Sequence, residues 1–294
     1  MEGEIRPLPR FGYFAPTSLD DVVSLLGEHK DESKLLAGGT DLLLNMKKRT
    51  VWPAVVVDLN RVTELSFVES RGRHIHIGAL TRLNDIKDSA TIRGKAPVLA
   101  EAIALLAANP IRNRASIGGN LCNASPAADT APALLVLNAW AKLRGPNGDR
   151  KVALSEFFLG PGQTARKADE VLTELIIPCE EGRSTFMKLG RRKGFTLSIV
   201  SVAGFVTIEN GKFKDVRVAL GAVAPTPMRS GRVEERLKGV EVNQEEIEKA
   251  AQLVKGELSP ITDVRASAEY RREMAYVLTK RILNKLAIGD GKCG

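Results

Sequence analysis

Two glycine pairs constrain the fold of this 294-residue chain more than any other feature. Gly38-Gly39 lies between residues 34–37, which predict a short apolar strand, and a helix expected from Asp41 onward. Gly118-Gly119 belongs to the stretch 114–138, in which a loop rich in Asn, Ser, Ala and Pro leads into an apolar run typical of a buried helix. Because glycine has no Cβ, backbone N–H groups can approach a ligand closely there, and a helix N-terminus favours an anion. Two such loops together favour a diphosphate ligand.

Neither loop matches a common phosphate-binding fingerprint. The GxGxxG pattern of a dinucleotide-binding Rossmann unit and the GxxxxGK[ST] pattern of a P-loop both fail here. For either glycine pair taken alone, an ordinary tight turn is an equally good interpretation. The flanking sequence is what favours a ligand site over two unrelated turns.

That flanking sequence resembles the FAD-binding medium subunit of the molybdenum hydroxylases, a family that includes carbon monoxide dehydrogenases, xanthine dehydrogenases and 4-hydroxybenzoyl-CoA reductases. Four segments match in the family's order: AGGTDLL (37–43), RASIGGNLCNASPAADTAPAL (114–134), KLGRRKGF (188–195) and ALGAVAPTPMRS (219–230). The resemblance covers nearly the whole chain, and the segment from SIGGN to ASPAAD is its most specific part. It implies an α+β fold, with a two-part FAD-binding region of the vanillyl-alcohol-oxidase/CO-dehydrogenase flavoprotein type before a C-terminal antiparallel sheet with helices.

The resemblance also implies which residues contact FAD. Backbone N–H groups of residues 38–41 and 116–120, with the hydroxyls of Thr40 and Ser116, would hold the diphosphate from two sides, which the chemistry of the loops supports as well. No catalytic or metal-ligating residue is expected. The full set expected at the cofactor is Leu36, Ala37, Gly38, Gly39, Thr40, Asp41, Ser116, Ile117, Gly118, Gly119, Asn120, Asn123, Asp129, Leu172 and Lys188.

Three of these residues carry separate expectations. Asp129 matches the family's acidic residue at the cofactor, and capping the helix that follows it is an alternative role that can coexist. Leu172 and Lys188 match positions beside the flavin ring in xanthine-oxidising relatives. A cation there would stabilise the negative charge of reduced flavin and raise its potential, whereas an ordinary surface lysine is the alternative. Phe195 departs from many relatives, so contacts around the ring stay open.

By the same resemblance, this chain is expected to be an electron-transfer subunit whose substrate chemistry lies on a partner. A large subunit would hold the molybdenum cofactor and a small subunit two two-iron two-sulfur clusters, in a heterotrimer or its dimer. The FAD here would pass electrons between those clusters and an external acceptor. A self-sufficient flavin-dependent oxidoreductase of the same superfamily is the alternative. A binding module that has lost FAD is disfavoured because both glycine loops are intact.

Composition limits the other classes of protein. The three cysteines, Cys122, Cys179 and Cys293, are too scattered for a CxxC metal site or a disulfide framework. No run approaches the roughly 20 apolar residues of a membrane span, and the first residues lack the apolar core of a signal peptide, so a cytoplasmic location is expected. The net charge is +8, but the basic residues are dispersed and aromatic content is 5%. A surface complementary to acidic partner subunits, or a solvated basic face, is therefore favoured over nucleic-acid binding.

Local patterns predict three parts. Residues 1–58 read as a small βαβ subdomain, with a helix capped by Ser18; residues 59–179 as a second FAD-binding subdomain; and residues 180–294 as a C-terminal α+β domain. The alternation of residues 66–79 predicts a half-buried strand with His74 and His76 facing solvent, without a third ligand for a metal. In the last part, Asn210-Gly211 predicts a hairpin turn, and residues 244–255 and 266–286 predict helices.

Overall fold

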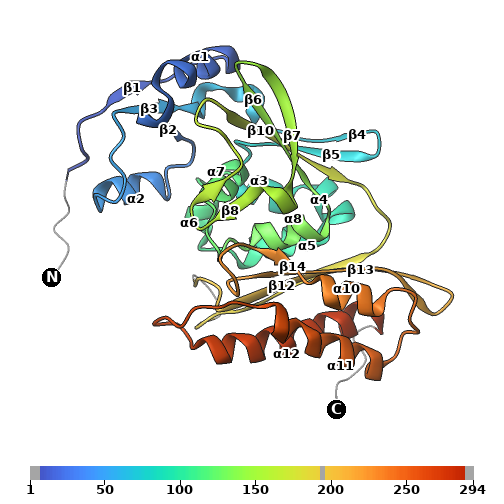
Figure 1. The fold of residues 1–294 in the computed structure, drawn as a ribbon. Coiled ribbons are helices and arrows are strands. Elements are labelled where there is room, and N and C mark those ends of the chain that lie inside the picture. The colour runs from blue at the N-terminus through green and yellow to red at the C-terminus, as the bar shows by residue number, and fades with distance from the viewer. Residues whose placement is uncertain (1–6, 193–195, 289–294) are drawn as a thin grey trace.

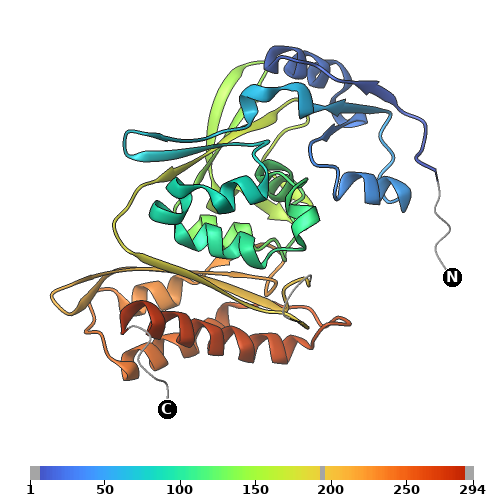
Figure 2. The ribbon, with the colours of Figure 1, turned by 180° about the vertical axis from the view of Figure 1, so that it is seen from behind.

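The computed structural model describes residues 7–192 and 196–288. The chain folds into three successive parts, each built on its own sheet, and they follow one another along the long axis of the molecule (Figures 1 and 2). This is the α+β architecture that the sequence predicts. Phe195 and Cys293 lie outside the described residues.

The N-terminal part is a parallel sheet of three strands in the order β1-β3-β2. Its apolar core is formed chiefly by Val22 and Leu26 of α1 against Val55 and Val57 of β3. The Ser18 hydroxyl accepts the Asp21 N–H at 3.2 Å, which confirms the predicted helix cap. The first glycine loop joins β2 to α2, directly after the carboxyl end of a parallel strand. The elements are β1 (Gly12–Phe14), α1 (Leu19–His29), η1 (Lys30–Glu32), β2 (Ser33–Leu36), α2 (Leu42–Lys47), β3 (Val55–Asp58), η2 (Leu59–Arg61) and η3 (Thr63–Leu65).

The middle part is an antiparallel sheet of five strands in the order β4-β5-β10-β6-β7, packed on helices. Every residue of α8 is buried, as the apolar run after the second glycine loop predicts. The second glycine loop lies around the start of α7. The elements are β4 (Val68–Arg71), β5 (His74–Gly78), α3 (Leu83–Asp88), α4 (Ala90–Lys95), α5 (Pro97–Leu105), α6 (Asn109–Arg112), α7 (Ile117–Cys122), α8 (Thr130–Val136), β6 (Trp140–Gly145), β7 (Gly148–Ala153), α9 (Leu154–Phe157), β8 (Phe158–Gly160), β9 (Gln163–Thr164) and β10 (Val171–Pro178).

The prediction of one strand over residues 66–79 is wrong. The segment forms a hairpin, β4 and β5, which turns at Gly72 with φ of +59°. His74 is exposed, as expected, but His76 is only partly exposed, and its Nδ1 lies 2.9 Å from Glu174 Oε2. Among the described residues, no cluster of His, Cys, Asp and Glu could hold a metal ion.

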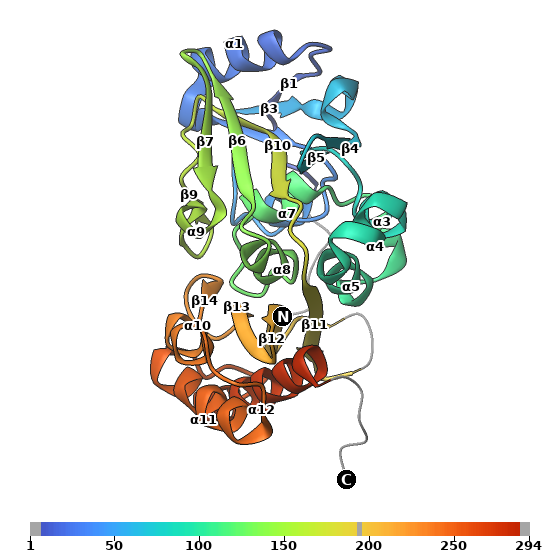
Figure 3. The ribbon, with the colours of Figure 1, turned by 90° about the vertical axis from the view of Figure 1, so that its right-hand side faces the viewer.

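The C-terminal part is an antiparallel sheet in the order β11-β12-β13-β14. Helices α10 to α12 cover one face, while α5 and α8 of the middle part cover the other (Figure 3). Gly204 allows the close contact with α12, because a Cβ there would lie 2.4 Å from Ile282 Cγ2. The β12–β13 turn has positive φ at Asn210 and Gly211, as the predicted Asn-Gly turn requires. The elements are β11 (Arg183–Leu189), β12 (Val200–Glu209), β13 (Lys212–Gly221), β14 (Met228–Arg229), α10 (Gly231–Leu237), α11 (Gln244–Leu253), η4 (Val254–Glu257) and α12 (Ala268–Ala287).

Helices in the described part of the chain are too short or too polar to cross a bilayer.

Candidate cofactor-binding site

The two glycine loops touch each other through their backbones. A Cβ on Gly38 would lie 2.2 Å from Arg114 O and 2.9 Å from Ala115 Cα, so only glycine permits this contact. A cavity of about 700 Å³ lies between the loops and extends over β2 and β10. The contact therefore joins the N-terminal and middle parts at the wall of one cavity.

Polar side chains behind the cavity hold the two loops together. Asn60 Nδ2 donates to the carbonyl oxygen of Ala37 at 2.9 Å, and the Arg82 guanidinium donates to Asn60 Oδ1 at 2.7 Å. Arg82 also donates to the carbonyl oxygen of Arg114. Burial, followed by the nearby charge of Arg114, lowers the pKa of Arg82. Each loop is thus anchored through Arg82, directly or by way of Asn60.

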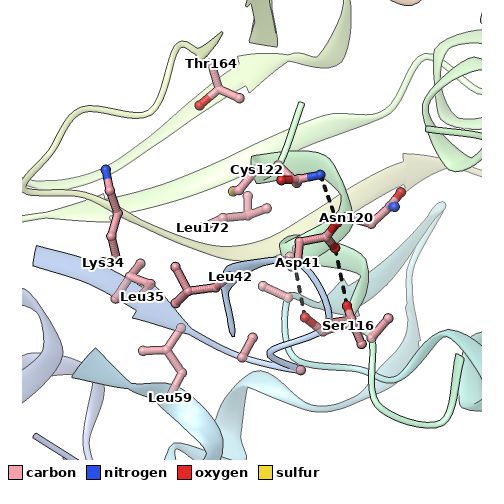
Figure 4. Close-up of a pocket in the computed structure, with 18 of the residues that line it drawn as sticks. Lys34, Leu35, Asp41, Leu42, Leu59, Ser116, Asn120, Cys122, Thr164 and Leu172 are labelled. Atoms are coloured by element: carbon pink, nitrogen blue, oxygen red, sulfur yellow. Dashed lines mark hydrogen bonds between the residues drawn. The ribbon is translucent and has the colours of Figure 1, made fainter. Parts of the chain in front are cut away.

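The cavity has an apolar side and a polar side. Figure 4 shows Leu35, Leu42 and Leu59 on one side, and Asp41, Ser116 and Asn120 on the other. Apolar side chains suit a flat aromatic group, and hydroxyl and amide groups suit a polar linker. The cavity therefore fits a ligand in which an aromatic ring is joined to a polar or anionic chain.

The first loop keeps its backbone donors for a ligand. The N–H groups of residues 38–41 donate to no acceptor within residues 7–192 and 196–288. Thr40 Oγ1 lies 3.3 Å from Asp41 Oδ2, on the cavity side. Four successive N–H groups at the start of a helix form a favourable site for phosphate oxygens. This agrees with the role expected for Gly38, Gly39, Thr40 and Asp41.

In the second loop the N–H groups of residues 117–120 are already bonded within the fold, which corrects the expectation for those four groups, whereas the Ser116 N–H has no acceptor among the described residues. The N–H of Ile117 donates to Thr81 O at 3.1 Å and that of Gly118 to Ala79 O at 2.9 Å. The N–H of Gly119 donates to the hydroxyl of Ser116, and that of Asn120 to the Ser116 carbonyl. This loop therefore presents side chains to the cavity and not a row of free N–H groups.

Most of the residues expected at the cofactor line this cavity of about 700 Å³, which is called the larger cavity below. They are Ala37, Gly38, Gly39, Thr40, Asp41, Ser116, Gly118, Gly119, Asn120, Asn123 and Leu172. Leu36 lies in β2 and Ile117 is fully buried in the middle core, and neither lines it. Leu35, Leu59 and Val171 also line the cavity and were not predicted, although the apolar residues of β2 and β10 were a usable signal. Arg166 was not predicted either, because its contribution depends on the fold of the loop after β9.

Asp129 and Lys188 meet outside the larger cavity. Lys188 Nζ lies 2.6 Å from Asp129 Oδ2, and the Asp129 and Lys188 side chains are 3% and 5% exposed. Asp129 makes no capping bond to α8, so the alternative role considered for it is wrong. Lys188 is not a surface lysine, because it is buried and lines a second cavity of about 310 Å³. Burial raises the pKa of Asp129. The ion pair with Lys188 and the hydrogen bond from Ser198 lower the pKa but do not outweigh burial.

Cys122 lines the larger cavity but is not poised as a nucleophile. Burial raises the pKa of its thiol, with a smaller opposing effect from Arg166. A thiol with a raised pKa is mostly protonated near neutral pH and reacts slowly. The side chain therefore serves as packing.

Comparison with known protein families shows which family the chain belongs to. Residues 9–180 match the FAD binding domain in molybdopterin dehydrogenase, and residues 184–286 match the CO dehydrogenase flavoprotein C-terminal domain. The chain belongs to the FAD-binding medium subunits of the molybdenum hydroxylases. It is an oxidoreductase component, and its free backbone donors and amphipathic cavity fit FAD.

Relatives extend over the whole chain. The carbon monoxide dehydrogenase medium chain of Hydrogenophaga pseudoflava is 35% identical, with 94% of this chain and 96% of that one covered. The glyceraldehyde dehydrogenase medium chain of Sulfolobus acidocaldarius is 32% identical, with 95% and 99% covered. Among solved structures, a chain of the Hydrogenophaga enzyme superposes with a TM-score of 0.93, at 96% and 99% coverage and 35% identity. A chain of quinoline 2-oxidoreductase from Pseudomonas putida gives 0.91, at 97% and 99% coverage and 30% identity.

Proposed function

We propose that this medium subunit relays electrons between two-iron two-sulfur clusters of a small partner subunit and an external acceptor. The substrate chemistry belongs to a large partner subunit with the molybdenum cofactor, in a heterotrimer or its dimer. When bound, FAD supplies the ability to exchange electrons singly or in pairs. The names of the relatives support this division of labour, since they describe medium chains and FAD subunits of dehydrogenases. Assembly in the cytoplasm is part of the proposal.

One observation carries the proposal. The free N–H groups of the first glycine loop and the polar side chains of the second loop line the same cavity. The N–H groups of residues 38–41 would hold the diphosphate. Ser116, Asn120 and Asn123 would contact it from the second loop. Leu172, with its neighbours on the apolar side, would pack on an aromatic end of the cofactor.

The flavin ring belongs at the Lys188 end. Adenine is uncharged in both redox states, whereas the flavin gains negative charge on reduction, so a buried cation favours the flavin. The smaller cavity is also lined by Leu105, which is 41% exposed. An exposed edge is what electron exchange with a partner requires. Three units, residues 1–58, 59–179 and 180–294, would then contribute to one cofactor site.

The test is purification through a tag on this chain, followed by an absorption spectrum and a gel. Flavin bands, iron–sulfur absorbance and two companion polypeptides are expected. A lone flavoprotein reduced by a small molecule would favour a self-sufficient flavin oxidoreductase. A colourless protein that stayed colourless after FAD was added would overturn the proposal. Large and small subunits that, tagged themselves, copurify with each other without this chain would overturn it too.

A further inference from the structure

A buried serine adjoins the Asp129–Lys188 pair and has no counterpart in the sequence prediction. Ser198 is fully buried, and its hydroxyl donates to Asp129 Oδ1, while Lys188 Nζ donates to the other oxygen. The three residues come from different segments: Asp129 precedes α8, Lys188 lies in β11 and Ser198 lies two residues before β12. Three polar groups of this kind, buried together, form a unit whose members depend on one another.

Lys188 has hydrogen-bonding capacity left over for a ligand. Its ammonium group has three donors, of which one reaches Asp129 and one reaches the carbonyl oxygen of Leu105 at 3.1 Å. The third has no acceptor among the described residues, and Lys188 lines the smaller cavity with Leu105, Leu189, Gly190, Arg192 and Thr196. The net charge at this cavity therefore depends on Lys188, on Arg192, which also lines the cavity, and on the negative charge that Asp129 keeps.

We infer that Ser198 is a positioning residue that sets the charge facing the flavin, because its hydroxyl keeps the Asp129 carboxylate ionised and paired with Lys188. This inference rests on the proposed function, in which the flavin ring lies at the Lys188 end. Ser198 itself acts through Asp129 and does not line either cavity.

The direction of the effect follows from the cost of burying a carboxylate. A hydrogen bond to the ionised form stabilises that form, and its loss in a buried position leaves the charge less well compensated. Without the Ser198 hydroxyl, Asp129 takes up a proton more readily. Lys188 then presents a fuller positive charge to the cavity, which favours the reduced cofactor. Removing the serine hydroxyl therefore raises the midpoint potential of the bound FAD.

The chain offers a matched control three residues further on. Ser201 lies in β12 and is also fully buried, but its hydroxyl has no hydrogen-bond partner within the part of the chain that the structure describes. Ser198→Ala and Ser201→Ala each remove one buried hydroxyl from neighbouring positions. Only the first removes a bond to the Asp129–Lys188 pair.

The experiment measures the midpoint potential of FAD in the purified complex by spectroelectrochemistry. Asp129→Asn should shift the equilibrium toward reduced FAD by about tenfold, which is about 30 mV for a two-electron couple. Ser198→Ala should shift it in the same direction by a smaller factor, Ser201→Ala should leave it unchanged, and Lys188→Met should shift it the other way. In the FAD-free protein, infrared spectra should show a carboxylic acid band from Asp129 in Ser198→Ala that is absent or weaker in the wild type.

Two results would overturn the inference. A potential that moves in Asp129→Asn and stays at the wild-type value in Ser198→Ala would make the serine a packing residue only. Equal shifts in Ser198→Ala and Ser201→Ala would make the effect a general consequence of core disturbance. A failure of the proposed function is separable from these, because a wild-type complex without flavin absorbance would show it before any variant is compared.

Discussion

The first glycine loop, residues 38–41, and the second, residues 116–120, line one cavity but use their backbones differently. In the first loop the N–H groups have no acceptor among the described residues. In the second loop the N–H groups of residues 117–120 are bonded to Ala79, Thr81 and Ser116, and only that of Ser116 has no acceptor among the described residues. Both begin with similar sequence, AGGT and SIGGN, so glycine content alone does not reveal which loop binds an anion through its backbone.

The difference teaches that glycine serves two purposes in this site. In the first loop it leaves the backbone open and allows close contact with the second loop at Arg114 and Ala115. In the second loop Gly118 allows the backbone to lie against Ala79, where a Cβ would come within 2.8 Å of the carbonyl oxygen. The second loop is therefore held in place by its own hydrogen bonds, and the first keeps free backbone donors that, in the proposed function, would bind the cofactor.

The largest expected effect comes from Gly38→Ala. The added Cβ would meet the Arg114 carbonyl oxygen at 2.2 Å, and backbone cannot move aside as a flexible side chain can. We expect the two loops to separate, the FAD affinity to fall by at least about 100-fold and the free energy of unfolding to fall by about 3 kcal/mol. Titration of the apoprotein with FAD, followed by flavin fluorescence, measures the first, and urea unfolding the second.

Gly27→Ala is the control for that variant. Gly27 lies inside α1, with no atom within 4 Å of an added Cβ, so alanine should stabilise the helix by roughly 0.5–1 kcal/mol. FAD affinity should not change. If Gly38→Ala bound FAD as tightly as Gly27→Ala does, the loop contact would have no part in cofactor binding.

A smaller effect distinguishes the two loops by the stability that each loses when one hydroxyl is removed. Ser116 caps α7 by accepting the Gly119 N–H, so Ser116→Ala should lower the free energy of unfolding by about 1 kcal/mol. The only hydrogen bond of the Thr40 hydroxyl among the described residues is to the exposed carboxylate of Asp41. Thr40→Val should therefore change the free energy of unfolding by less than about 0.5 kcal/mol. Each variant removes one hydroxyl from the cavity and should weaken FAD binding about fivefold.

Paired denaturation and FAD titrations of Ser116→Ala and Thr40→Val check both expectations. Equal losses of stability in the two variants would contradict the distinction between a second loop that is hydrogen-bonded within the fold and a first loop that is not. Unchanged FAD affinity in both would mean that neither hydroxyl faces the cofactor.

Local signals predicted the features that depend on few residues. The Asn210-Gly211 turn requires only two left-handed residues between alternating strands, and the buried α8 is continuously apolar, so both could be read directly. The hairpin at residues 68–78 was mistaken for one strand because β4 is mostly exposed and lacks an apolar face. Helix α10 and strand β7 were not predicted, since their signals are short and weak.

In the candidate site, only the features that the two glycine-loop motifs contain could be predicted from the sequence. The two loops could be placed at one ligand because their sequences resemble a known pair. Which loop keeps free N–H groups could not be predicted, because the acceptors at Ala79 and Thr81 come from a distant turn. Ser198 was missed for the same reason, since a serine next to apolar residues shows nothing of its bond to Asp129 across 69 positions.

The smallest expected effect tests whether the first loop binds its ligand through charge as well as hydrogen bonds. Asp41 places an exposed carboxylate beside the free N–H groups, where it would repel a diphosphate, and Asn123 Nδ2 lies 3.4 Å from its Oδ1. Asp41→Asn removes the charge and keeps the size, so FAD should bind about threefold more tightly at low salt. The gain should shrink as salt rises to physiological strength, because an exposed charge is screened within about 8 Å. Weaker binding by Asp41→Asn at every salt concentration would instead make the carboxylate an acceptor for a cofactor hydroxyl, and the first loop would then use a side chain, as the second does.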